Sequence, residues 1–159
     1  MSRVTRLLHK LATLSPREWV DLLQAQVALL AAQVLVWTRP TGRLVSHAAG
    51  VHAEAALSPE QAPVESAVMR RAQQIGLAVS RAGDYGIFRP LCLVRAVAVH
   101  RMLEGHGIRG SRIRIGVRMR RGRFGAHAWV ELAGCVVGDS EEHVGSFAEL
   151  SEVHLVDAP

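Results

Sequence analysis

Cysteine is scarce in this chain, which has two cysteines, Cys92 and Cys135, among 159 residues. So few cysteines cannot build the disulfide framework of a small secreted domain. No spacing of cysteine and histidine in the chain matches a structural zinc module either. We therefore expect no bound metal or other cofactor, and a reducing, cytoplasmic compartment for the protein.

Aromatic residues are also few, at 4%, and Lys10 is the only lysine. Apolar residues make up 49% of the chain and charged residues 21%, a balance typical of a globular protein rather than a disordered one. The net charge of +5 is carried almost entirely by arginine. A positive charge of this size is compatible with an acidic peptide, a nucleic acid or an anionic surface as partner.

Long uninterrupted apolar runs are missing as well. The most apolar stretch, from Trp19 to Trp37, contains Asp21 and several glutamines. A membrane span of ~20 residues carries few such groups. We therefore expect a helix that packs on the protein's own core, and membrane association is not expected. Contact of this helix with a partner protein or a membrane surface stays open as an alternative.

Helix signals dominate the chain before residue 110, except over 40–58, which is richer in Gly, His, Ser and Thr and is the likeliest linker. In "SPRE", Ser15 is the expected N-cap and Glu18 the third helical residue of a capping box, and "RPTG" ends that helix near Thr38. A second helix is expected over about 62–81, with a loop at 83–86.

A third helix opens after Pro90 and ends at a glycine, Gly105 or Gly107. The apolar period then changes to about two residues. In "SRIRIGVRMRRGRF" apolar side chains alternate with arginines, which predicts a strand. "GAHAWVEL" and "CVVGD" are the next two expected strands, joined by a tight turn at "AG". The tail predicts a short helix over 147–150 and a strand at "VHLV". Helices followed by an antiparallel meander indicate an α+β fold.

Cys92 is expected in the first turn of the third helix, within "FRPLCLVRAV". Unpaired backbone N–H groups and the helix dipole favour a thiolate at this position over a thiol. A nucleophilic cysteine also needs a base, usually histidine, and a group that orients the base. A small buried cysteine without reactivity remains the alternative for Cys92.

The expected hairpin offers such a base and its orienting group. On the second strand, His127 and Trp129 share one face. If the hairpin is centred on Ala133, Asp139 lies directly opposite His127, at ~5 Å between Cβ atoms. A two-residue turn would instead place Asp139 on the wrong face of the sheet. The pair therefore predicts a three-residue turn or a bulge, with Gly134 in a left-handed conformation.

The motifs "PLCLVRAVAVHRMLEGHGI", "RIGV", "FGAHAWVEL" and "VVGDS" resemble the transglutaminase-like (papain-like) cysteine peptidases. More narrowly, they resemble the B2 proteins of lasso-peptide biosynthesis, which remove the leader from a ribosomally made precursor. The resemblance is specific over about 89–140. It implies that Cys92 is the nucleophile, His127 the general base and acid, and Asp139 the orienting group. The family often has Asn before the aspartate, where this chain has Gly138.

The resemblance implies N-terminal helices packed on an antiparallel sheet, with the nucleophile at a helix N-terminus. We divide the chain into an N-terminal helical region, 1–58, which faces a partner or substrate, and a peptidase core, 59–159. The implied substrate is the leader–core junction of a precursor peptide. The implied partners are a separate leader-recognition protein and, as a further candidate, the lasso cyclase.

Two other functions stay open. The first is a non-catalytic peptide-binding or scaffold module on the same fold, in which Cys92 is merely buried. The second is nucleic-acid binding by the arginine-rich strand and turn over 112–123. Phe124 is the only aromatic residue near these arginines, so a solvated strand face or a contact with an acidic peptide fits them better. Trp129 is expected either to line the substrate groove or to pack in the core.

Overall fold

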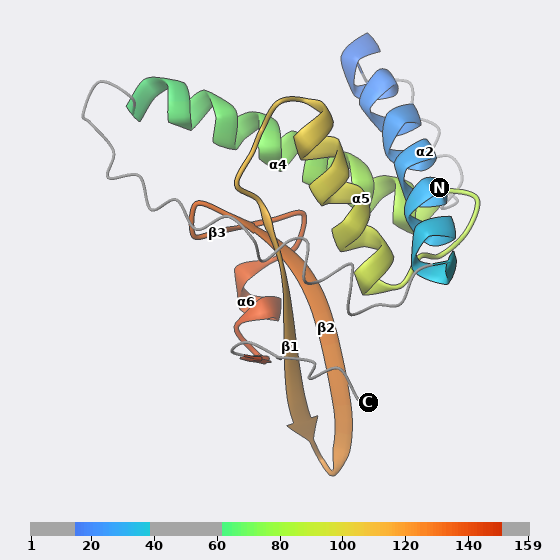
Figure 1. The fold of residues 1–159 in the computed structure, drawn as a ribbon, viewed down its shortest axis with the longest axis vertical. Helices are drawn as coiled ribbons and strands as arrows, with labels where there is room; N and C mark the ends of the chain where they lie inside the picture. Colours follow the sequence, from blue (N-terminus) through green and yellow to red (C-terminus); the bar gives the residue numbers. More distant parts are fainter. Residues whose placement is uncertain (1–14, 39–61, 151–159) are drawn as a thin grey trace, which may run out of the picture.

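The computed structural model describes residues 15–38 and 62–150 (Figure 1). Its elements are, in order, α2 (Pro16–Thr38), α4 (Ala62–Tyr85), α5 (Cys92–Gly105), β1 (Arg112–Arg120), β2 (Arg123–Leu132), β3 (Cys135–Val137), α6 (Glu141–Val144) and β4 (Ala148–Glu149). The long helices gather at one end of the molecule, and β1 and β2 form a ribbon that extends away from them. The predicted α+β fold is confirmed.

Helix α2 begins as its sequence predicts. The backbone N–H of Ser15 donates to Glu18 Oε2 at 2.8 Å, and the N–H of Glu18 donates to Ser15 Oγ at 3.4 Å. This reciprocal pair satisfies two N–H groups that an uncapped helix leaves without partners. At the other end, the Thr38 hydroxyl donates to the carbonyl of Val34 at 2.9 Å.

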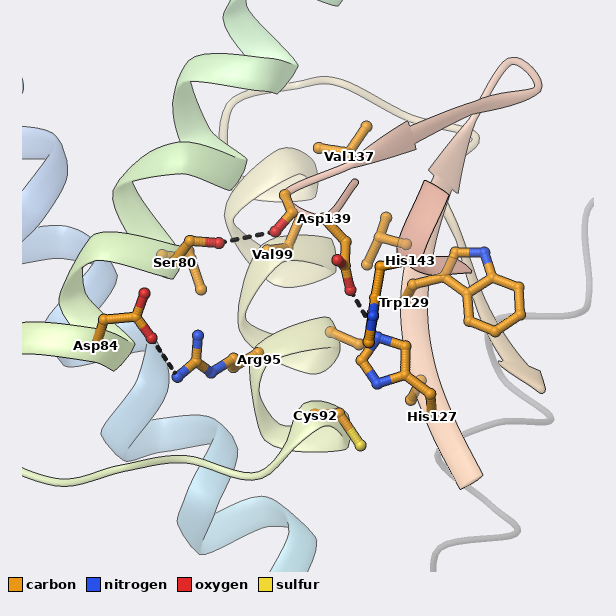
Figure 2. Close-up of a pocket in the computed structure, with 15 residues that line it drawn as sticks. Ser80, Asp84, Cys92, Arg95, Val99, His127, Trp129, Val137, Asp139 and His143 are labelled. Carbon is orange, nitrogen blue, oxygen red and sulfur yellow. Dashed lines mark hydrogen bonds and ion pairs between the residues drawn. The ribbon is translucent and has the colours of Figure 1, made fainter. Parts of the chain in front are cut away.

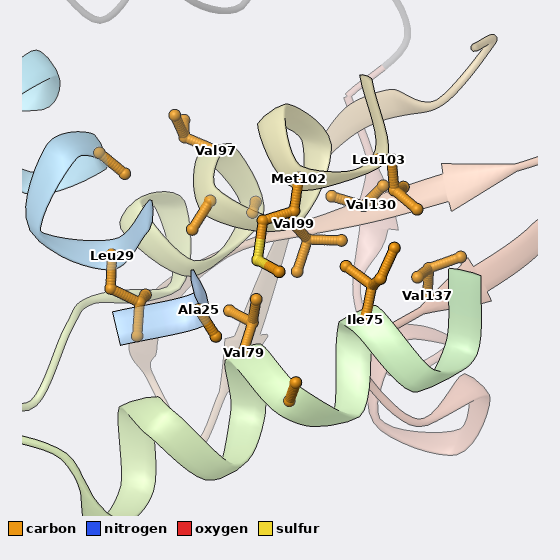
Figure 3. Close-up of a cluster of buried hydrophobic side chains, with 14 of the residues drawn as sticks. Ala25, Leu29, Ile75, Val79, Val97, Val99, Met102, Leu103, Val130 and Val137 are labelled. Carbon is orange, nitrogen blue, oxygen red and sulfur yellow. The ribbon is translucent and has the colours of Figure 1, made fainter. Parts of the chain in front are cut away.

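One face of α2 belongs to the main core. Ala25, Leu29 and Ala32 are fully buried and belong to one cluster with residues of α4 and α5. Figure 3 shows Ala25 and Leu29 in this cluster. By length and composition alone, α2 is also apolar enough to cross a membrane, a test that core helices of soluble proteins pass as well. The expected boundary near residue 58 lies outside the described residues, so the division into two regions stays a prediction.

Helix α4 is longer than predicted, because it continues to Tyr85 through the stretch expected as a loop. Tertiary contacts stabilise this extra turn. Asp84 forms an ion pair with Arg95 of α5 at 2.8 Å. A Cβ on Gly83 would lie 2.9 Å from Arg95 Cζ, so the guanidinium packs directly on the helix backbone there. A glycine in this position therefore allows a close approach rather than ending the helix.

The strands form one antiparallel sheet in the order β3-β2-β1-β4. The register of β1 and β2 runs from Arg112↔Glu131 to Arg120↔Arg123. Residues Ala128, Val130 and Leu132 of β2 join the core under α5, as the predicted alternation requires. The predicted meander of β1, β2 and β3 is confirmed.

The prediction of a short helix over 147–150 is wrong. The short helix is α6, earlier in the chain, where the Ser140 hydroxyl accepts the N–H of His143 at 3.2 Å as an N-cap. Residues 148–149 instead pair with the edge of β1, with Val117 opposite Ala148. Pairing with a distant strand has no local signature, which is why the sequence did not indicate it. The strand expected at "VHLV" lies outside the described residues.

A buried ion pair ties α2 to α4. Asp21 is 8% exposed and accepts two hydrogen bonds from the Arg71 guanidinium, at 2.6 and 2.7 Å. These hydrogen bonds lower the pKa of Asp21, against the opposing effect of its burial. The one charged side chain on the core-facing side of α2 is thereby paired, so it can remain ionised.

We expect Asp21→Asn to lower stability in a pH-dependent way. Because the folded pKa of Asp21 lies below its unfolded value, its stabilisation is full above the unfolded carboxyl pKa of ~3.9 and is lost as the pH falls through the folded value. The cost should be about 1–2 kcal/mol at neutral pH, reduced by the partial exposure of Arg71. Urea unfolding at pH 7 and pH 3 measures it. If the stability difference between wild type and Asp21→Asn is the same at both pH values, the ionised Asp21–Arg71 pair is not its cause.

Candidate active site

A pocket of about 370 Å³ opens between α4, α5 and the β2–β3 end of the sheet (Figure 2). The residues expected from the sequence come from three separate elements. Cys92 is contributed by the start of α5, His127 by β2, and Asp139 by the chain just after β3. The structure therefore gathers all three around one cavity.

Cys92 is the first residue of α5, so it lies in the first turn of the helix as the sequence predicted. The N-cap residue Leu91 has an extended backbone and makes no side-chain capping bond. The N–H groups of the first turn are therefore left without a side-chain acceptor. These groups and the helix dipole create a site that favours negative charge beside the Cys92 sulfur.

His127 and Asp139 are in direct contact, with 2.6 Å between Nε2 and Oδ2. Because a carboxylate only accepts hydrogen bonds, Nε2 carries the proton of this bond. The second carboxylate oxygen of Asp139 accepts the N–H of Ser140 at 2.8 Å, which fixes its orientation. The Nδ1 atom of His127 is then the ring nitrogen available to another partner. No hydrogen bond joins Cys92 to His127 in the described part of the chain.

The predicted three-residue turn between β2 and β3 is wrong. Leu132 pairs with Cys135, so the turn has two residues, Ala133 and Gly134. Both have positive φ, 49° and 79° respectively. This is the conformation of the turn whose twist matches that of the two strands. A regular ladder in this register would place Asp139 opposite position 128 and away from His127.

Gly138 explains how the contact forms in spite of this register. The strand ends at Val137, and Gly138 adopts a φ of 79°. The left-handed residue redirects the chain, and the Asp139 carboxylate reaches His127 without the bulge in the turn that the sequence reasoning required. Glycine adopts this conformation without strain, which accounts for its presence where the resembling family often has Asn.

Helix α4 holds Gly138 in place. A Cβ on Gly76 would lie 2.6 Å from both the Cα and the N of Gly138. The Ser80 hydroxyl, one turn further along α4, donates to the Gly138 carbonyl at 2.7 Å. Sequence reasoning missed both residues. Gly76 did carry a signal, because a glycine inside a helix costs about 1 kcal/mol relative to alanine and often marks a close approach.

We expect Gly76→Ala to destabilise the protein by about 1–3 kcal/mol, since the added methyl group overlaps backbone that cannot move aside. Gly105→Ala is the matched control, because a Cβ there would meet nothing within 4 Å. Urea unfolding of the two variants measures the difference. Equal stability of the two variants would show that α4 does not constrain the Gly138 turn.

Arg95 is a further pocket residue that the sequence did not single out. Its guanidinium pairs with Asp84, and its Nε donates to the carbonyl of Pro90 at 3.3 Å. Arg95 therefore links the end of α4 to the residues that lead into Cys92. No local sequence motif indicates this role, because Asp84 and the Pro90 carbonyl come close to Arg95 only in the folded chain.

Three rings, from β2 and from the α6 region, lie close to the His127 ring. The rings of His143, Phe147 and Trp129 lie 4.8, 5.2 and 6.3 Å from the His127 ring between centroids. Trp129 lines the pocket but is only 5% exposed, and its ring covers Gly116 of β1. Of the two roles left open for Trp129, packing is therefore the one that the structure shows most clearly.

The arginines of β1 were expected to face solvent, but two of them contact other parts of the chain. Arg114 pairs with Glu131 at 3.3 Å and with Glu149 at 2.8 Å. Arg118 donates to the Ser146 hydroxyl at 2.9 Å and stacks over Phe147. These two arginines hold β4 and the α6 end of the chain against β1.

His143 gives the site a possible ligand set for a metal. One donor atom from each of His127, Asp139 and His143 lies within 4.8 Å of the other two. Two imidazoles and a carboxylate are donors that suit Zn²⁺. A metal ion there would have to replace the hydrogen bond between His127 and Asp139.

The family model of the transglutaminase-like superfamily matches residues 27–152. The matched range includes Cys92, His127 and Asp139 and every described strand. No curated protein and no solved structure matches the chain.

Proposed function

The chain belongs to the transglutaminase-like superfamily, which includes cysteine peptidases, and from this we propose that it is a cysteine peptidase. We further propose that it removes the leader peptide from a ribosomally made lasso-peptide precursor. The observation that carries the proposal is the 2.6 Å contact between His127 and Asp139 in the pocket that Cys92 lines.

The proposed reaction begins with the Cys92 thiol losing its proton to Nδ1 of His127. The thiolate attacks the carbonyl carbon at the leader–core junction, and the backbone N–H of Cys92 stabilises the oxyanion. His127 then donates the proton to the leaving amine of the core peptide. The leader remains on Cys92 as a thioester.

Water completes the cycle. His127 takes a proton from the water that attacks the thioester, and the leader leaves with a free carboxylate while Cys92 regains its thiol. Asp139 holds the His127 ring in the tautomer that keeps Nδ1 free to accept a proton. A primary amine in place of water would give acyl transfer with the same residues.

The pocket supports binding of the scissile junction rather than of a whole peptide. Its volume of about 370 Å³ lies near the lower end of the ~300–1,000 Å³ that small-molecule sites occupy. We propose that a separate leader-recognition protein delivers the precursor and that the lasso cyclase uses the released core. These partners rest on the sequence resemblance over 89–140, and a cytoplasmic location, which we also propose, rests on the scarcity of cysteine.

The test is incubation of the protein with candidate precursors, with and without a leader-recognition protein. Mass spectrometry should show separate leader and core peptides. An acid quench should trap the protein with the mass of the leader added and one water lost. Iodoacetamide should also label Cys92 faster than Cys135 near neutral pH.

Each negative outcome has a distinct meaning. A precursor that binds but stays intact would indicate the peptide-binding scaffold that the sequence left open. A product that carries an added amine would indicate acyl transfer. Tight, salt-dependent binding to generic DNA would indicate that the protein binds nucleic acid instead.

A further inference from the structure

A row of large apolar side chains on α2 faces solvent. This α2 stripe consists of Val20 (51% exposed), Leu23 (64%), Val27 (67%), Leu30 (43%), Val34 (57%) and Trp37 (79%). The helix lies at the outer edge of the helical end of the molecule (Figure 1). Contiguous exposed apolar surface of this kind is typical of an interaction site.

The spacing within the α2 stripe is that of a coiled-coil seam. Successive members are alternately three and four residues apart from Val20 to Trp37, so they occupy the a and d positions of a heptad. The a positions are all valine, and the d positions are leucine, leucine and Trp37. Valine at a with leucine at d favours a parallel pair of helices over larger bundles.

The remaining positions of α2 show that the seam is separate from the core face. The buried residues Ala25, Leu29 and Ala32 fall at f and c positions, on the side opposite to a and d. Helix α2 therefore has one apolar face used within the domain and a second that no described residue covers.

We propose that the α2 stripe pairs with the α2 stripe of a second copy of this chain, in a parallel two-stranded coiled coil about a twofold axis. The e and g positions that flank the stripe between Leu23 and Val34 are Gln24, Ala31, Gln26 and Gln33, none of which is charged. Two identical helices therefore meet without like-charge repulsion. A seam built for a different partner commonly specifies it by complementary charges at these positions.

The charges of α2 fit a membrane surface less well. Helices that lie on membranes carry lysine and arginine on the polar face. Arg17 is the only basic residue of α2, and it stands next to Glu18. The a/d stripe is also narrower than the apolar face of such a helix.

A short seam can be sufficient for dimerisation because α2 is already folded as part of the domain. Helix α2 does not depend on the dimer for its own stability, because it is already held against α4 and α5 through its other face. Association then costs little further ordering of the backbone. One helix pair buries less than a standard interface of ~1,600 Å², so we expect a dissociation constant on the order of micromolar.

Sedimentation velocity of the full chain tests the proposal without any substrate, so its result is independent of the peptidase assignment. From about 1 µM to about 200 µM, a range that brackets the expected constant, the wild type should pass from monomer to dimer. Leu23→Glu should remain monomeric at all concentrations, because it places like charges in the seam. Leu77→Glu, which adds the same charge to an exposed position on α4, should dimerise as the wild type does.

A crosslink tests the parallel arrangement. Val20→Cys should form a disulfide with the same residue of the second copy, because a parallel seam places identical a positions opposite each other. Leu77→Cys is the matched control and should not crosslink.

A wild type that stays monomeric overturns the proposal. So does a dimer that Leu23→Glu does not dissociate, or one in which Val20→Cys fails to crosslink. Binding to vesicles of phosphatidylcholine and phosphatidylglycerol tests whether the α2 stripe contacts a membrane instead. If a monomer binds these vesicles and Leu23→Glu releases it, α2 is a membrane contact and the proposed dimer is wrong.

Discussion

Cys92→Ala is expected to reduce precursor cleavage by about three orders of magnitude or more. The variant lacks the sulfur that forms the thioester in the proposed reaction, while the pocket and the His127–Asp139 pair stay in place. The mutation removes one sulfur from a partly exposed position, so folding should be unaffected. Single-turnover cleavage followed by mass spectrometry measures the effect.

Cys135→Ala is the matched control for this experiment. Cys135 is also partly exposed and free, but it lies on β3 outside the pocket lining. Its removal should leave the cleavage rate within about twofold of the wild type. Normal cleavage by Cys92→Ala would remove the peptidase proposal as drawn and leave Cys92 as a structural residue.

Asp139→Asn is expected to lower kcat by about 10³–10⁴ with little change in KM. An asparagine amide can donate a hydrogen bond to Nε2 of His127, which would move the ring proton to Nδ1. The nitrogen that should accept the thiol proton would then already be protonated. Steady-state kinetics on a precursor that the wild type cleaves separates the two constants.

Glu142→Gln controls for the loss of one negative charge near the site, because Glu142 is exposed on α6 just beyond Asp139. It should leave both constants unchanged. A fall of kcat below about tenfold in Asp139→Asn would mean that another group orients His127. A large rise in KM at constant kcat would assign Asp139 to substrate binding instead.

Local sequence features predicted the parts of the molecule that local interactions stabilise. The capping box of Ser15 and Glu18 fixed the start of α2 because both partners lie within one turn. The expectation of Cys92 in the first turn of α5 followed from Pro90 and is confirmed, although Pro90 itself lies just before the N-cap residue Leu91. The alternation in β1 and β2 identified the strands because side chains of a strand alternate between faces.

At the candidate site, the register of the β2–β3 hairpin was predicted wrongly from the sequence. The expected pair of His127 and Asp139 is present, but the three-residue turn inferred from it is absent. The sequence reasoning assumed that the third strand stays regular as far as Asp139. Gly138 breaks that strand one residue earlier, and its conformation is set together with Gly76 of α4, 62 positions away in the chain.

By itself, then, the sequence determined the fold class, the start of the helix that carries Cys92, and the residue types of the candidate site. Caps and strand alternation act over a few residues, so they can be recognised in a single sequence. The tertiary structure alone decided the length of α4, the pairing of β4 and the direction of the Asp139 carboxylate. Each of these depends on backbone or guanidinium contacts between residues far apart in sequence, and no local pattern records which distant atoms will meet.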